Sequence, residues 1–195
     1  MKLFTIRHGE TSYNAQGKYM GHTDIALNAL GKRQAQAAAR VLNKYKFDFI
    51  YCSDLKRTKQ TLKEVLQFHK NTPVIYDESI RERKLGELEG VRGQDWDWDL
   101  LPGSFMKRKP RGGESLDEMK RRIKRFLEKL RKDHSKDTVL VVSHGGTMRM
   151  IHVILAGGSV VKLFKTFKFQ NTAVCEYEIS GSKVKIHQFN ETKHL

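Results

Sequence analysis

The chain has 195 residues, of which 38% are hydrophobic, and this length suits one domain better than two. No apolar run approaches the roughly 20 residues of a membrane-spanning helix, and the amino terminus lacks the apolar stretch of a secretory signal peptide, so we expect a cytoplasmic protein with no membrane partner. The formal net charge of +15 suits a polyanion, an anionic lipid surface or phosphorylated substrates as partners.

The first part of the chain alternates short apolar runs with amphipathic stretches. Residues 2–6, 48–52 and 73–76 are predicted strands. Asn28 is predicted to cap a helix whose buried stripe consists of Leu30, Ala37, Ala38, Val41, Leu42 and Tyr45. Asp54 is predicted to cap the next helix, and the buried face of that helix would be Leu55, Thr58, Leu62, Val65 and Leu66.

The second part of the chain predicts a long basic helix and a closing hairpin. Ser115 and Glu118 have the spacing of a capping box. The apolar positions that follow are three or four residues apart and predict one buried face: Leu116, Met119, Ile123, Phe126, Leu127 and Leu130. The opposite face is rich in lysine and arginine, which we interpret as a solvated surface. Residues 138–142 are a predicted strand, and residues 172–179 and 183–189 are the predicted hairpin.

This order of elements predicts an α/β fold. We expect a three-layer α/β/α sandwich with a mostly parallel central sheet, helices on both faces and a C-terminal hairpin, all in one domain over residues 1–195. Residues 86–113 are an irregular insertion, and insertions of this length are often lids or binding loops. Cys52 and Cys175 lie far apart in strand-like runs and are predicted to be buried free thiols.

Polar residues suited to phosphoryl chemistry follow several of the predicted strands. Arg7 and His8 end the first strand, and Arg57 lies in the first turn of the helix after the second. Glu82 follows the third strand, and His144 follows the strand at 138–142. Because ligands of an open parallel sheet bind beyond the carboxyl ends of its strands, we expect these side chains to meet in one crevice.

Each residue type has a role that its chemistry supports. Arginine is always charged and binds two phosphoryl oxygens at once, and a neutral imidazole is a competent nucleophile at neutral pH. A carboxyl group such as that of Glu82 can protonate the departing oxygen and then accept a proton from water. The backbone N–H groups of Gly145 and Gly146 open a predicted helix and can bind a phosphate oxygen.

These residues also resemble a known family. The stretches Arg7-His8-Gly9-Glu10-Thr11 and Ser143-His144-Gly145-Gly146, with further matching blocks between them, are similar to the histidine phosphatase superfamily, also called phosphoglycerate mutase-like. The resemblance implies that His8 is the phosphorylated nucleophile and Glu82 the proton donor and acceptor. It places Arg7, Asn14, Gly21, Arg57, His144 and Gly145 around the phosphate, and it implies no metal and no cofactor.

Within that family the chain resembles the phosphatases. Glycolytic mutases carry a longer insertion after the glutamate, whereas fructose-2,6-bisphosphatase-like enzymes of the apoptosis and glycolysis regulator type, and broad-specificity phosphatases, are more similar. The resemblance implies a metal-independent phosphomonoesterase acting on small phosphorylated metabolites. Met20 is a departure, since such relatives often place a substrate-touching polar residue there. We also expect the basic cluster at 107–111 to bind a second anionic group of the substrate.

Two other functions stay open. A phosphoglycerate mutase would use the same pocket, and nucleic-acid binding is suggested by charge alone. The second is disfavoured because the aromatic residue of the basic helix, Phe126, lies on its apolar side. Trp96 and Trp98 are predicted to pack the insertion onto the body rather than to touch substrate. The remaining histidines are assigned structural or solvent-facing positions: His22, His69, His134, His152, His187 and His194.

Overall fold

The computed structural model describes all 195 residues and contains one six-stranded sheet in the order β3-β2-β4-β1-β5-β6. The strands are β1 (Lys2–Arg7), β2 (Phe49–Cys52), β3 (Val74–Tyr76), β4 (Thr138–Ser143), β5 (Val174–Ser180) and β6 (Lys183–Glu191). The first four run parallel to one another, whereas β5 is antiparallel to β1 and β6 is antiparallel to β5. The predicted mostly parallel sheet with a closing hairpin is therefore confirmed.

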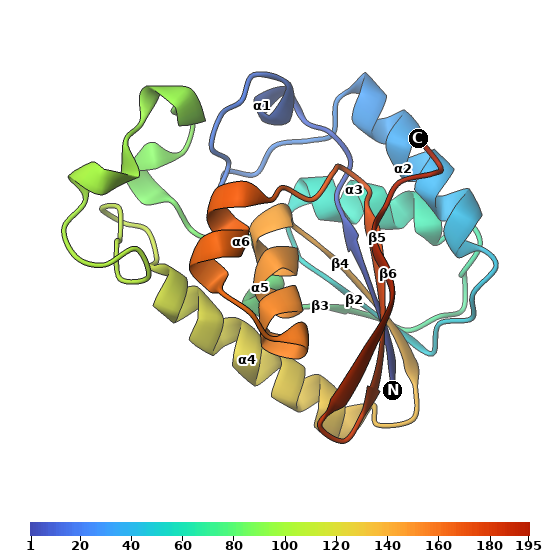
Figure 1. Ribbon diagram of the computed structural model, residues 1–195. Helices are drawn as coiled ribbons and strands as arrows, with labels where there is room; N and C mark the ends of the chain where they lie inside the picture. Colours follow the sequence, from blue (N-terminus) through green and yellow to red (C-terminus); the bar gives the residue numbers. More distant parts are fainter.

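Helices cover both faces of the sheet (Figure 1). One face carries α2 (Ala29–Leu42) and α3 (Lys56–Val65). The other carries α4 (Leu116–Asp133), α5 (Gly145–Ala156) and α6 (Val160–Thr166). The short helix α1 (Ser12–Ala15) lies beyond the carboxyl ends of the parallel strands, at the upper edge of the sheet in Figure 1.

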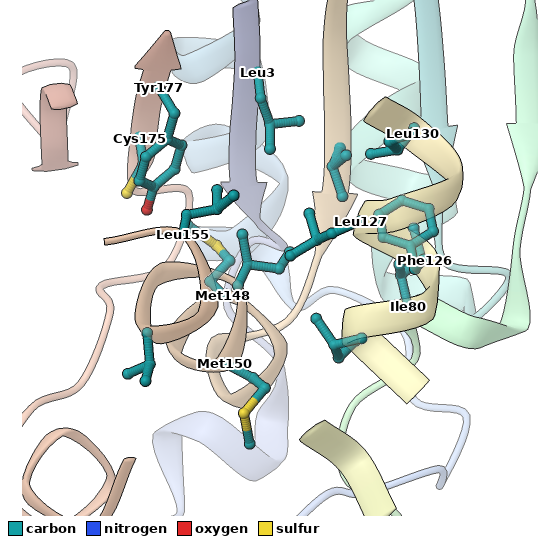
Figure 2. Close-up of a cluster of buried hydrophobic side chains, with 14 of the residues drawn as sticks. Leu3, Ile80, Phe126, Leu127, Leu130, Met148, Met150, Leu155, Cys175 and Tyr177 are labelled. Carbon is teal, nitrogen blue, oxygen red and sulfur yellow. The ribbon is translucent and has the colours of Figure 1, made fainter. Parts of the chain in front are cut away.

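Alternation along the strands builds a separate core on each face. Leu3, Val139 and Val141 point toward α4 and α5 in a cluster of 22 buried residues, part of which is shown in Figure 2. Their sequence neighbours Phe4 and Leu140 point the other way, into a cluster of 13 buried residues beneath α2 and α3. Because successive strand side chains face opposite sides, one short apolar run supplies both cores.

The long basic helix α4 begins at the predicted cap and has the predicted buried face. The Ser115 side chain accepts a hydrogen bond from the Glu118 N–H, and the Glu118 carboxylate accepts one from the Ser115 N–H, which confirms the capping box. The buried residues are those expected: Leu116, Met119, Ile123, Phe126, Leu127 and Leu130.

One local prediction was partly wrong and another was wrong. Asn28 does cap α2, and Ala38 and Leu42 of the predicted stripe are buried, but the other buried residues of that helix are Gly31, Ala35 and Ala39, and Leu30 is 41% exposed. These small residues allow α2 to approach its neighbours closely along a face that the larger residues Leu30 and Tyr45 do not mark. Asp54 does not cap α3, whose N-cap is Leu55 without a side-chain bond. The Asp54 carboxylate instead binds the guanidinium of Arg81, with 2.7 Å between Oδ1 and Nε.

Residues 86–113 contain no strand and no α-helix, only the short 3₁₀ helices η2 (Gly86–Leu88), η3 (Gly93–Asp95) and η4 (Trp98–Leu100). Figure 1 shows this segment extending from the body above α4. The Trp98 indole donates to the Tyr19 hydroxyl at 2.7 Å, and the Arg83 guanidinium lies 4.7 Å from the centre of the Trp98 indole. Trp98 therefore packs the segment onto the body, as predicted.

The basic cluster at 107–111 is largely paired within the protein. Arg108 binds Asp99, Lys109 binds Glu118, and Arg111 binds Glu87. Only Lys107 has no carboxylate partner among the four cations. These pairs disfavour the prediction that the cluster binds a second substrate anion, because each guanidinium or ammonium would first have to leave its carboxylate.

Both cysteines are buried and free, as predicted. No helix in the structure combines the length and the apolar character that crossing a bilayer requires.

Candidate active site

The register of the sheet brings the two strand-end histidines together. Arg7 of β1 is paired with Ser143 of β4 in parallel register. His8 and His144 are the next residues along the two strands, so they leave the sheet side by side. Their ring centres lie 5.2 Å apart at an interplanar angle of 61°, and both residues are almost completely buried.

A hydrogen bond fixes the tautomer of His8. Its Nδ1 lies 2.8 Å from the carbonyl oxygen of Gly9, which can only accept, so Nδ1 carries the proton and Nε2 keeps its lone pair. Burial, followed by the charges of Arg57 and Arg7, holds the pKa of His8 well below its ordinary value. The imidazole is therefore neutral at neutral pH, with its free nitrogen available.

Arg57 connects the second histidine to the loop before α2. Its Nε donates to Nδ1 of His144 at 3.1 Å, so the His144 proton is on Nε2, which donates to the Ser53 hydroxyl at 2.8 Å. Nη1 and Nη2 of Arg57 donate to the carbonyls of Thr23 and Gly21, each at 2.8 Å. Burial lowers the pKa of Arg57 to about 10, and the guanidinium remains charged at neutral pH.

The backbone conformation and the closeness of Glu89 require glycine at position 21. Its φ is +49°, and a Cβ at this position would lie 2.2 Å from Oε1 of Glu89. The tight turn directs the Gly21 carbonyl toward Arg57, so this residue positions the guanidinium through its backbone.

Arg7, the residue before His8, is held by the loop that follows α6. Its Nη1 donates to the carbonyl of Phe169 at 2.6 Å, while Nε is buried without any partner. Gly145 leaves space beside it, since a Cβ there would lie 3.3 Å from Arg7 Nε. Burial lowers the pKa of Arg7 to about 10. Nη2 donates to no protein atom, which leaves its two N–H groups for an anion.

Glu82 is fixed by the amino terminus of α5. Its Oε2 accepts from the Gly146 N–H at 2.8 Å and its Oε1 from the Arg83 N–H at 2.9 Å. A Cβ at Gly146 would lie 2.1 Å from Glu82 Oε1, so only glycine allows this approach. The expectation that Gly146 offers its N–H to a phosphate oxygen was wrong, because that N–H already binds Glu82.

Asn14 presents one unused donor. Its Oδ1 accepts from the Thr11 N–H at 3.1 Å and from Nδ2 of Asn171 at 3.4 Å. The amide nitrogen of Asn14 has no partner in the structure and can donate to an anion. Asn171 also donates to the His8 carbonyl at 3.0 Å, so it holds both residues.

Ser53, Asn171 and His22 lie next to these groups but were not selected from the sequence. His22 Nε2 donates to the Glu82 carbonyl at 2.9 Å, so its assignment to a purely structural or solvent-facing position was incomplete. Ser53 follows β2 directly, and a rule that weighs every polar residue at a strand end would have selected it. Met20 is buried, with its sulfur 3.6 Å from the Thr11 hydroxyl, and contributes packing there.

The assembled site is an anion receptor around a nucleophile. The charges of Arg57 and Arg7 act on a neutral imidazole whose Nε2 lone pair is free. Burial lowers the pKa of both arginines, and Glu82, when ionised, partly offsets this effect. Fixed cations of this kind stabilise the negative charge that spreads over a phosphoryl group in transfer. The arrangement supports phosphoryl transfer to His8.

Comparisons with known proteins agree with this chemistry. Phosphoserine phosphatase 1 of Hydrogenobacter thermophilus is 35% identical over 202 residues, covering 100% of this chain and 94% of the relative. Phosphoglycerate mutase-like protein 4 of Arabidopsis thaliana is 32% identical over 204 residues, covering 100% of this chain and 86% of the relative. The solved structure of a phosphoserine phosphatase mutant from Entamoeba histolytica in complex with phosphoserine has a TM-score of 0.87 and 28% identity, covering 100% of this chain and 98% of that chain.

The family model described as histidine phosphatase superfamily (branch 1) matches residues 3–192, nearly the whole chain. The match includes both strand-end histidines and all the residues that surround them in the structure. This chain belongs to the histidine phosphatase superfamily.

Proposed function

We propose that this protein hydrolyses small phosphomonoesters through a phosphohistidine on His8. Nε2 of His8 attacks phosphorus while the bond to the ester oxygen breaks, and Glu82 gives its proton to that oxygen. Water then attacks the phosphohistidine and gives a proton to Glu82. The products are the alcohol and inorganic phosphate, and both residues return to their starting states.

The observation that carries this proposal is the hydrogen bond from His8 Nδ1 to the Gly9 carbonyl, 2.8 Å long. It directs the lone pair of Nε2 into the space that Arg7 and Arg57 border. A protonated ring would be unable to attack phosphorus, and the depressed pKa of His8 supports a neutral ring throughout the neutral range.

Several N–H donors bind the phosphoryl group in this proposal. Arg7 Nη2, the Asn14 amide and the remaining Arg57 N–H groups bind the phosphoryl oxygens. His144 donates from Nε2 to the Ser53 hydroxyl, which leaves that hydroxyl's own proton free for a phosphoryl oxygen. Gly21 and Gly145 contribute through their backbones. Because the charge neutralisation comes from arginine, the scheme requires no metal ion.

The substrate class follows from the relatives. A relative is named phosphoserine phosphatase 1, and a solved structure of a similar protein is a complex with phosphoserine. We therefore propose a small phosphorylated metabolite of that kind as the substrate. The basic face of α4 is a solvated surface and not a nucleic-acid site in this proposal. Two buried free thiols support a reducing compartment, the cytoplasm.

The test is to trap the intermediate. The protein is mixed with phosphomonoester labelled in the phosphoryl group, quenched in alkali, where phosphohistidine survives, and analysed for labelled peptides. We expect label on His8, and we expect His8→Ala to lose about 10⁴-fold or more in kcat/KM.

His187→Ala is the matched control, because His187 lies on β6 and binds only Glu178. Its label and rate should equal those of the wild type. Label on another residue, or His8→Ala turnover close to wild type, would refute the proposal. Recovery of the phosphoryl group on a new position of phosphoglycerate, with no free phosphate, would identify the mutase instead.

A further inference from the structure

The segment that carries Glu82 lies outside the regular secondary structure. Between η1 (Glu78–Ile80) and η2 the chain forms no helix and no strand, so no ladder of backbone hydrogen bonds fixes it. Side chains from other parts of the protein bind its carbonyls instead. Three of these contacts are the Ser143 hydroxyl to the Ile80 carbonyl at 2.7 Å, the Thr147 hydroxyl to that of Arg81 at 2.8 Å, and His22 Nε2 to that of Glu82 at 2.9 Å.

Arg122 of α4 binds more of this segment than any other side chain. Its Nη1 donates to the Ser79 carbonyl at 2.6 Å and to the Arg81 carbonyl at 3.1 Å, and its Nη2 makes a longer contact of 3.5 Å to the Glu82 carbonyl. The other N–H groups of Nη2 and Nε donate to the carboxylate of Glu114. All five N–H groups of the guanidinium therefore bind protein atoms, and none is left for a ligand.

Glu114 holds the part of the segment that follows Glu82. Its Oε1 accepts from the Lys84 N–H at 3.1 Å, and its own N–H donates to the Lys84 carbonyl at 2.9 Å. Its carbonyl accepts from Arg83 Nε at 2.9 Å. The side chains of Arg122 and Glu114 are only 18% and 16% exposed. This ion pair therefore connects the backbone on both sides of Glu82 to one helix.

The helix that supplies Arg122 is a rigid support. The neighbouring residues Met119 and Ile123 are completely buried, and Ile80 of the segment packs in the same buried cluster as Phe126 of α4 (Figure 2). The Glu82 carboxyl group itself is bound only by the N–H groups of Gly146 and Arg83. A shift of the backbone at 79–84 would thus carry this carboxyl group away from the start of α5.

We propose that Arg122, paired with Glu114, is a positioning residue that fixes the Glu82 carboxyl group for proton transfer to the departing oxygen. This inference rests on the proposed function and deepens it. Arg122 acts through the carbonyls of the segment and not through the carboxyl group. The side chains of His8, Arg7 and Arg57 form no hydrogen bond with residues 79–84: their partners are Gly9, Phe169, Gly21, Thr23 and His144. Loss of Arg122 should therefore impair proton donation more than nucleophilic attack.

The experiment compares two aromatic esters of similar size that differ in their need for a proton. The nitrophenolate of 4-nitrophenyl phosphate leaves without one, whereas the alkoxide of benzyl phosphate must be protonated as it departs. The ratio kcat/KM reports the step in which the ester bond breaks. In Arg122→Gln we expect kcat/KM to fall about 10- to 50-fold for benzyl phosphate and no more than about threefold for 4-nitrophenyl phosphate. Glu82→Gln should show the same selectivity with a larger loss.

Arg125→Gln is the matched control, because it removes the same charge from an exposed position of α4. Both of its rates should equal those of the wild type. An equal loss for the two esters in Arg122→Gln would show that the ion pair only supports the fold, and unchanged rates would show that Glu82 needs no such support; either result overturns the inference. If Arg122→Gln does not fold, the double variant with Glu114→Gln replaces it, since it leaves no unpaired charge.

Failure of the proposed function is distinguishable from failure of this inference. A selective loss in Glu82→Gln together with an unselective loss in Arg122→Gln would overturn this inference alone, whereas an unselective loss in Glu82→Gln would remove the proposed proton donor and this inference with it. If the wild type hydrolyses neither ester, the amide resonance of Gly146 reports the contact with Glu82 without substrate. It should shift in Arg122→Gln and not in Arg125→Gln, and an unchanged resonance in Arg122→Gln would overturn the inference.

Discussion

The edge of the sheet that holds His8 and the segment from residue 86 to 113 are stabilised in different ways. At the sheet edge, backbone groups and buried side chains hold each polar group: Gly9 fixes His8, Gly146 fixes Glu82, and Ser53 fixes His144. The segment is held by Trp98 on Tyr19 and by surface ion pairs such as Arg111–Glu87, in which Arg111 is 89% exposed.

The two regions therefore differ in how much it costs to displace their polar groups. Buried hydrogen bonds to backbone are costly to break, because the partner left behind has no water to bind. Exposed ion pairs contribute between nothing and about 1 kcal/mol each, so those of the segment add little to the backbone hydrogen bonds that join Gly90, Val91 and Gly93 to residues 17–19. We infer that the sheet edge keeps the reacting groups in position.

The largest effect is expected from crowding the sheet edge. Gly146→Ala would place a Cβ 2.1 Å from Glu82 Oε1, so the carboxylate must move. A displacement of this size costs about 100-fold in kcat/KM when it misplaces a proton donor. Steady-state kinetics on a phosphomonoester measures the loss, and the thermal unfolding curve shows whether the protein stays folded.

Gly93→Ala supplies the corresponding change in the segment. A Cβ there would meet the Tyr19 ring at 3.4 Å, an ordinary contact, so kcat/KM should change by no more than about twofold. Equal losses in the two variants would contradict the separation of the two regions.

A smaller effect is expected from loosening the segment. Trp98→Phe removes the hydrogen bond to the Tyr19 hydroxyl and keeps an aromatic ring for Arg83. Losing about 1 kcal/mol of positioning should raise KM about fivefold and leave kcat nearly unchanged. Leu100→Ala is the control, because Leu100 is 72% exposed in the same segment. A fall in kcat with constant KM would show that the segment takes part in the chemical step.

The smallest effect is expected on the pH dependence of the free energy of unfolding. The hydrogen bond between Asp54 and Arg81 holds the pKa of Asp54 below its ordinary value. The pair therefore stabilises the folded state above the unfolded pKa of about 3.9, and this contribution disappears as the pH falls through the lower folded pKa. Such a partly exposed pair contributes up to about 1 kcal/mol.

Asp54→Asn should accordingly be less stable than the wild type at pH 7 and equally stable at the lowest pH that still permits folding. Urea unfolding at several pH values measures the difference. Parallel stability curves from pH 7 to pH 3 would show that the Asp54–Arg81 pair contributes no pH-dependent stability.

The local pattern was sufficient for elements that have one buried face and a clear cap. The buried residues of α4 follow from the spacing of its apolar residues, and Ser115 and Glu118 mark its start. The carboxyl ends of β1 and β4 follow from apolar runs that end in Arg7-His8 and Ser143-His144. The meeting of the two histidines at one edge then needs only the parallel sheet that alternating strands and helices favour.

Other features depended on which groups meet in space. Asp54 had two partners available, a helix N-terminus and an arginine 27 residues away, and only the folded chain brought Arg81 within 2.7 Å. Spacing alone also gave no sign that Arg108 would bind Asp99 or that α2 would bury Gly31 and Ala35 and expose Leu30. The sequence by itself determined the residue types and strand ends that make phosphoryl chemistry possible, because these depend on local patterns. The tertiary structure alone decided which cations are paired, as Arg108 is with Asp99, because a charge is satisfied by whatever lies next to it in space.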